Sequence, residues 1–258
     1  RRLTIIARMK QKLRNGSPPR ELELKLAIDK RADGARRLRD ILSAGERDAP
    51  VTRRLRTIYF DTPSHDLRSK HISLRVRQVE GSWRQSVKAE TRIRGGLSNP
   101  IEVEGDVKGP LPDLRAVADT KRRRRLRKII GSNQLKRLFE TDVRRTTQTV
   151  SDTQGNHVEI AFDDAAIKSA TDTEEFGELE LELKRWRPNG IMEIVKLISQ
   201  NDIPVRPSSY SNAERGYRLV LKESNAALKP KKLKQSPLKA GQSAPKAFQA
   251  LLEWTVEQ

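Results

Sequence analysis

The feature that most constrains the fold of this chain is alternation of charged and apolar residues, repeated in segment after segment. Successive side chains of a β-strand point to opposite faces, so this alternation predicts strands with one apolar and one charged face. Seven segments have this pattern: ELELKLAI (21–28), ISLRVRQV (72–79), SWRQSVKAE (82–90), PIEVEG (100–105), TDVRRTTQTV (141–150), HVEIAFD (157–163) and GELELELK (177–184).

Helical spacing is less frequent and predicts helices over residues 33–44, 114–130 and 191–200. The segments YFDTP (59–63) and DTQGN (152–156) are typical of turns. Seven or eight antiparallel strands with a few helices indicate an α+β domain, and eight strands are enough to close a barrel.

Composition suggests how the chain is divided. Residues 1–20 hold seven Lys or Arg and no acid, which favours a disordered basic lead-in to a domain over 21–222. Residues 223–243 include LKPKKLKQSPLKAG and have the composition of a basic linker. Within 244–258, apolar residues recur at helical spacing, so we expect the start of a further helical domain there.

The composition of the chain favours one class of partner and excludes several classes of site. The chain has 53 Lys and Arg against 34 Asp and Glu, a formal net charge of +19, which favours an anionic partner. It has no cysteine, so disulfides, thiol nucleophiles and cysteine zinc sites are excluded. No apolar run approaches the roughly 18 residues of a membrane span, and no signal peptide is recognisable, so we expect a cytoplasmic location and no membrane span.

The charged strand faces carry mostly one sign each. Arg75 and Arg77 share a face, as do Glu102 and Glu104, whereas Arg144 and Arg145 leave the register of their strand ambiguous. A solvated sheet face is the simplest interpretation. However, like charges about 7 Å apart repel by roughly 2.4 kcal/mol at an effective dielectric constant of 20. Paired glutamates suit Mg²⁺ or Mn²⁺, and paired cations suit phosphate, so inward-facing strands would hold a metal-bound polyphosphate.

An ordered series of motifs resembles one known family. ELELK opens it, followed by YFDTP, LRVR, a strand centred on Lys88, ExE at 102–104, FETDVRR at 139–145, VEIAFD, ELELELK and SNAERGY at 211–217. Over about 200 residues this series is similar to the CYTH superfamily, the triphosphate tunnel metalloenzymes. The resemblance implies a closed eight-stranded antiparallel barrel with its charged faces inward and helices outside. It also implies metal-dependent hydrolysis of inorganic triphosphate or polyphosphate, with ATP as a further candidate substrate.

The resemblance also assigns roles by position. The expected phosphate-binding and catalytic cations are Lys25, Arg75, Arg77, Lys88 and Arg145, with Lys184 and Arg215 as further phosphate ligands. The expected ligands of Mg²⁺ or Mn²⁺ are Glu21, Glu23, Glu102, Glu104, Asp163, Glu180 and Glu182, of which Glu102 and Glu104 are alternatively expected to orient the attacking water. Water would then attack the terminal phosphorus, assisted by the cation.

Two positions depart from the pattern of the bacterial subgroup in which a helical CHAD domain follows. Asn212 stands where a lysine is usual, which removes a positive charge near the substrate. His71 stands where a glycine is common, so the preceding turn is expected to differ. The segment 244–258 would be the truncated start of the CHAD-like domain.

Other signals and functions remain open. The run KRRRRLRK (121–128) reads as a solvated outer helix, or as a surface for nucleic acid or polyphosphate, although no specific nucleic-acid motif accompanies it. The three histidines lack metal-site spacing. Two alternatives to a triphosphatase are a non-catalytic polyphosphate- or nucleotide-binding module and a class IV-type adenylate cyclase.

Overall fold

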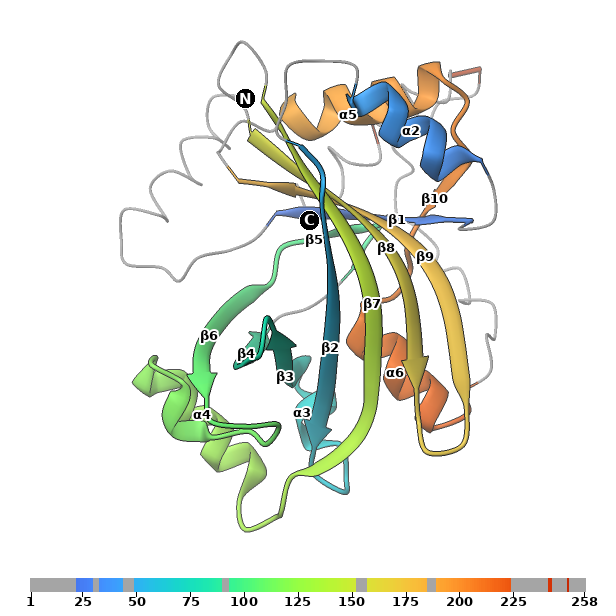
Figure 1. The fold of residues 1–258 in the computed structure, drawn as a ribbon. Helices are drawn as coiled ribbons and strands as arrows, with labels where there is room; N and C mark the ends of the chain where they lie inside the picture. The colour runs from blue at the N-terminus through green and yellow to red at the C-terminus, as the bar shows by residue number, and fades with distance from the viewer. Residues whose placement is uncertain are drawn as a thin grey trace.

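The computed structural model describes residues 22–29, 33–43, 49–89, 93–151, 157–184, 189–223, 241–242 and 250. Over these residues the chain forms a ten-stranded antiparallel sheet that curls strongly on itself, with a few helices around it (Figure 1). The strands are β1 (Glu23–Ile28), β2 (Val51–Asp61), β3 (Ile72–Val79), β4 (Ser82–Ala89), β5 (Leu97–Ser98), β6 (Ile101–Val107), β7 (Lys136–Ser151), β8 (His157–Lys168), β9 (Thr173–Leu183) and β10 (Val205–Pro207). The helices are α2 (Gly34–Ser43), α3 (Asp66–Ser69), α4 (Thr120–Ile130), α5 (Asn189–Gln200), α6 (Asn212–Val220) and the 3₁₀ turn η1 (Leu114–Ala116).

The α+β class and the antiparallel curled sheet agree with the sequence, but over the described residues the backbone ladder does not close into a ring of eight strands. Its order is β10-β1-β9-β8-β7-β2-β3-β4-β6, an open path, with β5 pairing with β1 outside it. Only Asn99 and Pro100 separate β5 from β6. The chain therefore passes within a few residues from a pair with β1 to a pair with β4, which brings the two ends of the sheet near each other.

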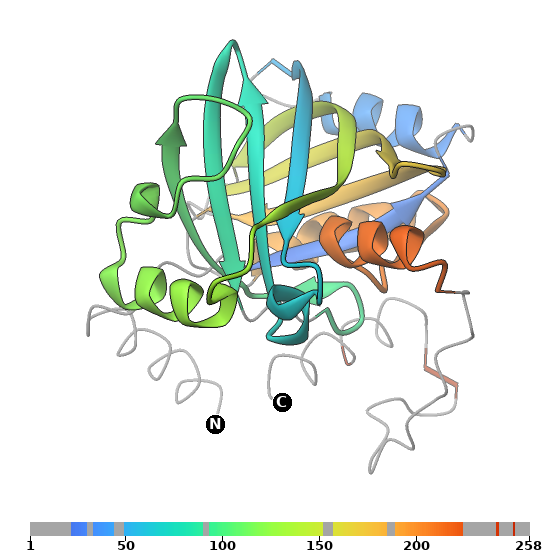
Figure 2. The ribbon, with the colours of Figure 1, turned by 90° about the horizontal axis from the view of Figure 1, so that it is seen from below.

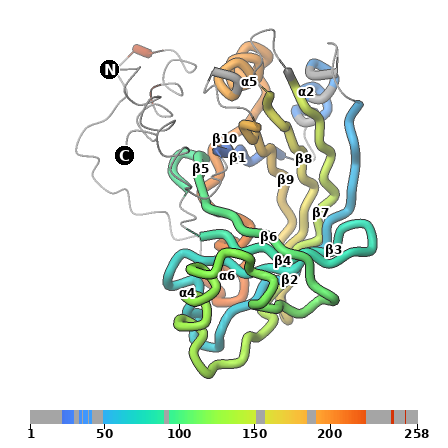
Figure 3. The backbone as a smooth tube through the Cα atoms, turned by 90° about the vertical axis from the view of Figure 1, so that its left-hand side faces the viewer, coloured from blue at the N-terminus to red at the C-terminus, as the bar shows by residue number. Residues whose placement is uncertain are grey.

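The apolar faces of the strands lie outside and are covered by helices. On one side, α2 and α5 pack on β1, β8 and β9, and the predicted stripe of Ile191, Ile194, Val195 and Ile198 is buried there. On the other side, α3 and α4 pack on β2, β3 and β4 through Leu67, Leu126 and Ile130. Figure 3 shows α2 and α5 at one end of the described part of the molecule and α4 at the other, and Figure 1 shows α3 at the same end as α4. Because the apolar faces are used in this way, the charged faces must point into the concave side of the sheet.

All seven predicted strands are present, but the turn predicted at YFDTP is wrong in part, because Tyr59, Phe60 and Asp61 end β2. The first four residues of β2 are exposed, whereas its last five are all buried. A strand covered on both faces loses the alternation that marks half-buried strands, which explains why β2 was missed.

The helix predicted over 114–130 is interrupted. It consists of η1 and α4, and α4 starts only after Asp119, whose carboxylate accepts a hydrogen bond from the backbone N–H of Arg122 (2.9 Å). The helix α6 was not predicted, because Gly216 lies in its middle and lowers helix propensity. Its Tyr217 packs with Tyr59, Phe139 and Ile167 on the concave side of the sheet.

Several expectations concern residues that the structure does not describe. The lead-in over 1–20, Glu21, the turn at 152–156, and nearly all of the linker and of the segment 244–258 lie outside the described residues. Among the helices that the structure does describe, none is both long and apolar enough to cross a membrane.

Candidate functional site

The concave face of the curled sheet encloses a charged cavity of about 230 Å³. Among the described residues, eight strands and the start of α6 contribute to its lining, and Figure 2 shows the two groups of strands as facing walls. Of the residues that the structure describes, five cations line it: Lys25, Arg75, Arg77, Lys88 and Arg145. Six carboxylates from the same part of the chain line it as well: Glu23, Glu102, Glu104, Glu159, Glu180 and Glu182.

The first wall, from β3, β4 and β6, is organised around Glu102. The register of β4 and β6 places Glu102 opposite Lys88, and their Nζ and Oε2 atoms lie 2.8 Å apart. Arg75 reaches the other carboxylate oxygen of Glu102 with Nη2 (3.0 Å), and Ser86 donates a hydrogen bond to the same oxygen. Burial alone would raise the pKa of Glu102, but Arg75 and Lys88 outweigh it and lower the pKa.

The second wall, from β1, β7, β8 and β9, is organised around Glu180. Lys25 is paired with one of its oxygens, and Arg145 Nη2 with the other (2.6 Å). Arg145 also makes a bidentate pair with the fully buried Asp163, at 2.7 and 2.6 Å. Burial opposes the charge of Lys25, but Glu180, Glu23 and Glu178 outweigh it and raise the pKa of the amine. Each wall therefore holds its cations in place with its own carboxylate.

Arg77 is the exception among the cavity cations. Its Nε donates to Thr57 Oγ1 (3.0 Å), and no ion pair joins it to a carboxylate among the described residues. Burial, followed by the nearby guanidinium of Arg75, lowers the pKa of Arg77 to about 10. A cation shielded from water without a counter-charge is costly, so this position favours a bound anion.

Three carboxylates form a row across neighbouring strands. The registers place Glu182 of β9 opposite both Glu23 of β1 and Glu159 of β8. Ser98 donates a hydrogen bond to Glu23 (2.7 Å), and Lys184 bridges Glu182 (2.8 Å) and Glu159 (3.3 Å). Carboxylate oxygens on adjacent strands are the donors that Mg²⁺ and Mn²⁺ prefer, so this row fits such a cation by chemistry. Within the described part of the chain, no three of these side chains yet converge as a preformed metal cluster.

One end of the cavity is formed by the start of α6. Ser211, Asn212 and Ala213 line the cavity there, and Ser211 caps the helix by accepting a hydrogen bond from the Glu214 N–H (3.2 Å). Further along the inner faces of the strands, Leu55, Val143, Ala165 and Phe176 pack together in an apolar cluster outside the charged lining.

The structure brings most predicted site residues together. Ten of them line the cavity: Glu23, Lys25, Arg75, Arg77, Lys88, Glu102, Glu104, Arg145, Glu180 and Glu182. The ambiguous register of β7 is also resolved, because Arg145 faces inward and Arg144 is exposed on the opposite face.

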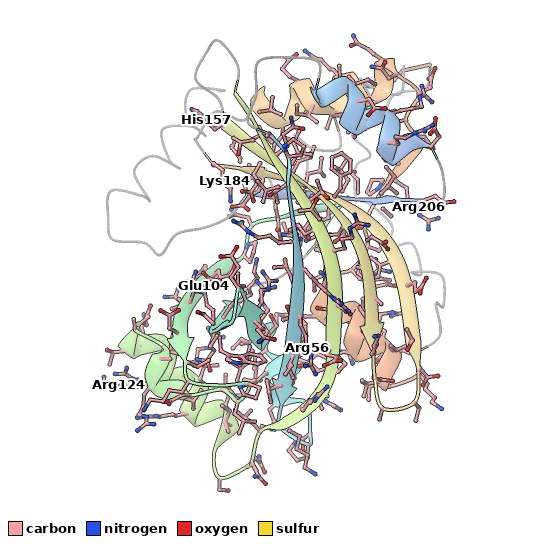
Figure 4. All side chains as sticks on the ribbon, in the orientation of Figure 1. Arg56, Glu104, Arg124, His157, Lys184 and Arg206 are labelled. Atoms are coloured by element: carbon pink, nitrogen blue, oxygen red, sulfur yellow. The ribbon has the colours of Figure 1, made fainter. Side chains whose placement is uncertain are left out.

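Three predicted residues lie elsewhere. Asp163 is behind Arg145, and Lys184, labelled in Figure 4 at the end of β9, lies beside the carboxylate row. Arg215 is paired with Glu174 (2.9 Å) and stacks on Phe176, with 4.3 Å from its Cζ atom to the ring centre. Arg215 is therefore held by β9 and does not line the cavity.

Sequence reasoning missed several lining residues. Tyr59 lies opposite Arg75 in the β2–β3 register but belonged to a segment interpreted as a turn. Ser73 shares a strand face with Arg75, and Glu159 shares one with Asp163. The alternation of charged and apolar residues could therefore have predicted that both line the cavity. Ser211 became predictable only once α6 was known.

Comparison with known proteins gives consistent findings. Residues 19–217 match the family model of the CYTH domain. An inorganic triphosphatase from Haemophilus influenzae is 29% identical over 173 residues, which cover 64% of this chain and 46% of that protein. The chain thus spans about half the length of this curated relative. A Hippeastrum adenylyl cyclase candidate, HpAC1, whose structure is described as revealing a dominant triphosphatase activity, superposes with a TM-score of 0.55 at 20% identity, covering 75% of this chain and 93% of that one.

Proposed function

This chain belongs to the CYTH domain family, and on that premise we propose that its cavity binds inorganic triphosphate and hydrolyses the terminal phosphoanhydride bond. The observation that carries the proposal is the cavity itself, which five cations from two walls line among the described residues; one of them, Arg77, has no carboxylate partner among those residues. The name of the Haemophilus influenzae relative, inorganic triphosphatase, supports the same substrate.

In this proposal the cations of both walls bind phosphate oxygens. Arg77 can bind a phosphate oxygen without breaking an ion pair, because no carboxylate among the described residues is paired with it. Arg75 and Lys88 turn from Glu102 toward the phosphates, and Lys25 and Arg145 turn from Glu180. Arginine supplies a bidentate fork and lysine a point charge, so the set suits a short chain of phosphates. Asp163 serves as a positioning residue that fixes Arg145 from behind.

Glu23, Glu159 and Glu182 would hold the Mg²⁺ or Mn²⁺ ion, with Glu21, outside the described residues, as a further ligand expected from its position. A bound divalent cation neutralises charge that develops on the phosphate oxygens. Glu104, on β6 in Figure 4, is the most exposed carboxylate of the lining and is proposed to orient the attacking water. Water attacks the terminal phosphorus and gives up a proton, the bridging P–O bond breaks with its oxygen leaving on pyrophosphate, and the attacked phosphorus is released as orthophosphate.

The proposal includes a closed tunnel. The pairing of β5 with β1, directly before β6 pairs with β4, supports closure of the curled sheet around the substrate. Tyr59 is the one aromatic residue among the described residues of the lining, which offers little for stacking a nucleotide base. Inorganic triphosphate or polyphosphate is therefore proposed in preference to ATP, and hydrolysis in preference to cyclisation.

The test is release of orthophosphate from inorganic triphosphate and from ATP, with Mg²⁺, Mn²⁺ or EDTA. The intact chain is compared with Glu182→Gln in the cavity and with Glu193→Gln, an exposed carboxylate of α5 that pairs with Lys196. We expect release from triphosphate that needs the metal, falls at least 100-fold in Glu182→Gln and is unchanged in Glu193→Gln. Tight binding of triphosphate without turnover would instead identify a binding module, and cyclic AMP with pyrophosphate from ATP would identify a cyclase.

A further inference from the structure

The outer face of α4 carries a stripe of four cations. Lys121, Arg124, Arg125 and Lys128 are spaced at i, i+3, i+4 and i+7, so they share one helix face, and all four are exposed. Figure 4 shows Arg124 pointing away from the sheet. We call these four residues the α4 stripe.

No carboxylate among the described residues forms an ion pair with the α4 stripe. Other cations of this helix are used locally: Arg122 pairs with Asp119, and Arg123 donates to the backbone carbonyl of Val117 (3.1 Å). Like charges at i and i+4, such as Lys121 with Arg125 and Arg124 with Lys128, repel each other and destabilise a helix. A helix that needed only solubility would carry mixed signs, so the unmixed stripe indicates an anionic partner that relieves this repulsion.

The stripe is presented by a firmly anchored element. Asp119 caps the start of α4, Gly131 follows its end with φ 58°, and Leu126 and Ile130 are buried in the core beneath it. The helix covers the outer face of β3 and β4, while the inner face of the same strands lines the cavity. The stripe and the cavity therefore lie on opposite sides of one wall.

We propose that the α4 stripe docks a long, linear inorganic polyphosphate chain outside the cavity. The stripe consists only of ammonium and guanidinium groups, which bind phosphate oxygens. It offers no aromatic or amide side chain to stack on or read a base, which favours a phosphate chain over a nucleic acid. Because this surface is separate from the cavity, its binding does not depend on whether the cavity hydrolyses triphosphate.

The test is equilibrium binding of fluorescently labelled long-chain polyphosphate to the full chain in EDTA, over a series of salt concentrations. The stripe variant replaces all four residues with glutamine. A matched control removes the same charge from exposed positions on β7, β8 and α5 and in the turn after α6: Arg144→Gln, Lys168→Gln, Lys196→Gln and Lys222→Gln. We expect the stripe variant to lose at least 10-fold in affinity at moderate salt and the control to lose less than 3-fold.

The salt dependence distinguishes direct contacts from general attraction. Four phosphate contacts, each contributing about 0.7 to the slope of log affinity against log salt for a single-stranded polyanion, predict a slope smaller by about 3 in the stripe variant. Binding of inorganic triphosphate should not change. Equal losses in the stripe and control variants would overturn the proposal, and so would tighter binding of single-stranded or duplex DNA than of polyphosphate, which would assign the stripe to nucleic acid.

Folding of the variants is checked by urea unfolding, where removal of like charges should leave the stripe variant at least as stable as the intact chain. Should it fail to fold, two double variants replace it: Lys121→Gln with Arg125→Gln, and Arg124→Gln with Lys128→Gln. Each double variant is then expected to reduce the slope of log affinity against log salt by about half as much as the full stripe variant would. An unchanged slope in both double variants would equally overturn the proposal.

Discussion

Arg77 is the residue whose surroundings say most about the cavity. Its neighbours on the wall, Arg75 and Lys88, share the carboxylate of Glu102, whereas among the described residues Arg77 is hydrogen-bonded to the hydroxyl of Thr57 and paired with no carboxylate. The alternation of residues 72–79 predicted that Arg77 would share a face with Arg75. It did not predict which of the two would lack a counter-charge, because that depends on the register with β2 and β4, which is set by pairing across the sheet.

Replacing this side chain should stabilise the unliganded protein. In Arg77→Met we expect the free energy of unfolding to rise by about 1 kcal/mol, because a cation without a counter-charge leaves a partly buried position. Urea unfolding in a phosphate-free buffer measures this change. The matched control is Arg144→Met on the exposed face of β7, which should stay within about 0.5 kcal/mol of the intact chain. A marked loss of stability in Arg77→Met would mean that the arginine has an internal partner.

The paired carboxylates predict how stability depends on pH. The pKa values of Glu102 and Glu180 are lowered by their cations despite burial. The unfolded chain, with glutamates near 4.3, therefore binds more protons than the folded one as the pH falls below about 5, and stability decreases with falling pH. In Glu102→Gln we expect lower stability at pH 7 and a shallower loss between about pH 5 and pH 3.

Urea midpoints measured over this pH range test the prediction, with Glu193→Gln as the control that should keep the slope of the intact chain. An unchanged slope in Glu102→Gln would contradict the assignment of this carboxylate as a lowered-pKa group.

At the scale of elements, the strands that sequence could predict are those with one face on a helix-covered core and one face in the cavity. The strand β2 and the helix α6 could not be predicted from the sequence, for two different reasons. The end of β2 is buried on both faces, and α6 carries a glycine where helix propensity argues against one. That glycine is explained by tertiary packing, because a Cβ atom on Gly216 would lie 2.1 Å from Phe139 Cε2.

Gly216→Ala should therefore destabilise the protein, although alanine is the better helix former. The ring of Phe139 cannot easily move, because it packs between two other rings. It is stacked on Tyr59, with 4.6 Å between the ring centres, and contacts Tyr217 edge-on, with 5.6 Å between the ring centres. We expect a loss of about 1 to 3 kcal/mol, the usual cost of overpacking a core. Thermal or urea unfolding measures it.

The control is Gly109→Ala, where a Cβ atom would meet nothing within 4 Å and little change is expected. Combining Gly216→Ala with Phe139→Leu should cost less than the sum of the two single changes, because the smaller side chain leaves room for the methyl group. Strict additivity would refute the proposed contact.

At the scale of the whole molecule, two walls that are far apart in sequence face each other across one cavity. The second wall alone joins residues far apart in sequence, because Lys25 of β1 pairs with Glu180 of β9, 155 positions later. Alternation indicates which side chains share a face of each strand, but not which strands become neighbours. The inward direction came from the family resemblance, and the open ladder with its β5 link came only from the structure.

The most direct measurement of the central claim is calorimetric titration of inorganic triphosphate into the intact chain, Arg77→Met and Arg144→Met at one ionic strength in EDTA, so that the ligand is not hydrolysed during the titration. One lost charge-assisted contact of about 1.5 to 3 kcal/mol corresponds to roughly 10- to 150-fold. The account predicts a loss of affinity of that size in Arg77→Met and none in Arg144→Met. Full affinity in Arg77→Met, or equal losses in both variants, would contradict a triphosphate site between the two walls.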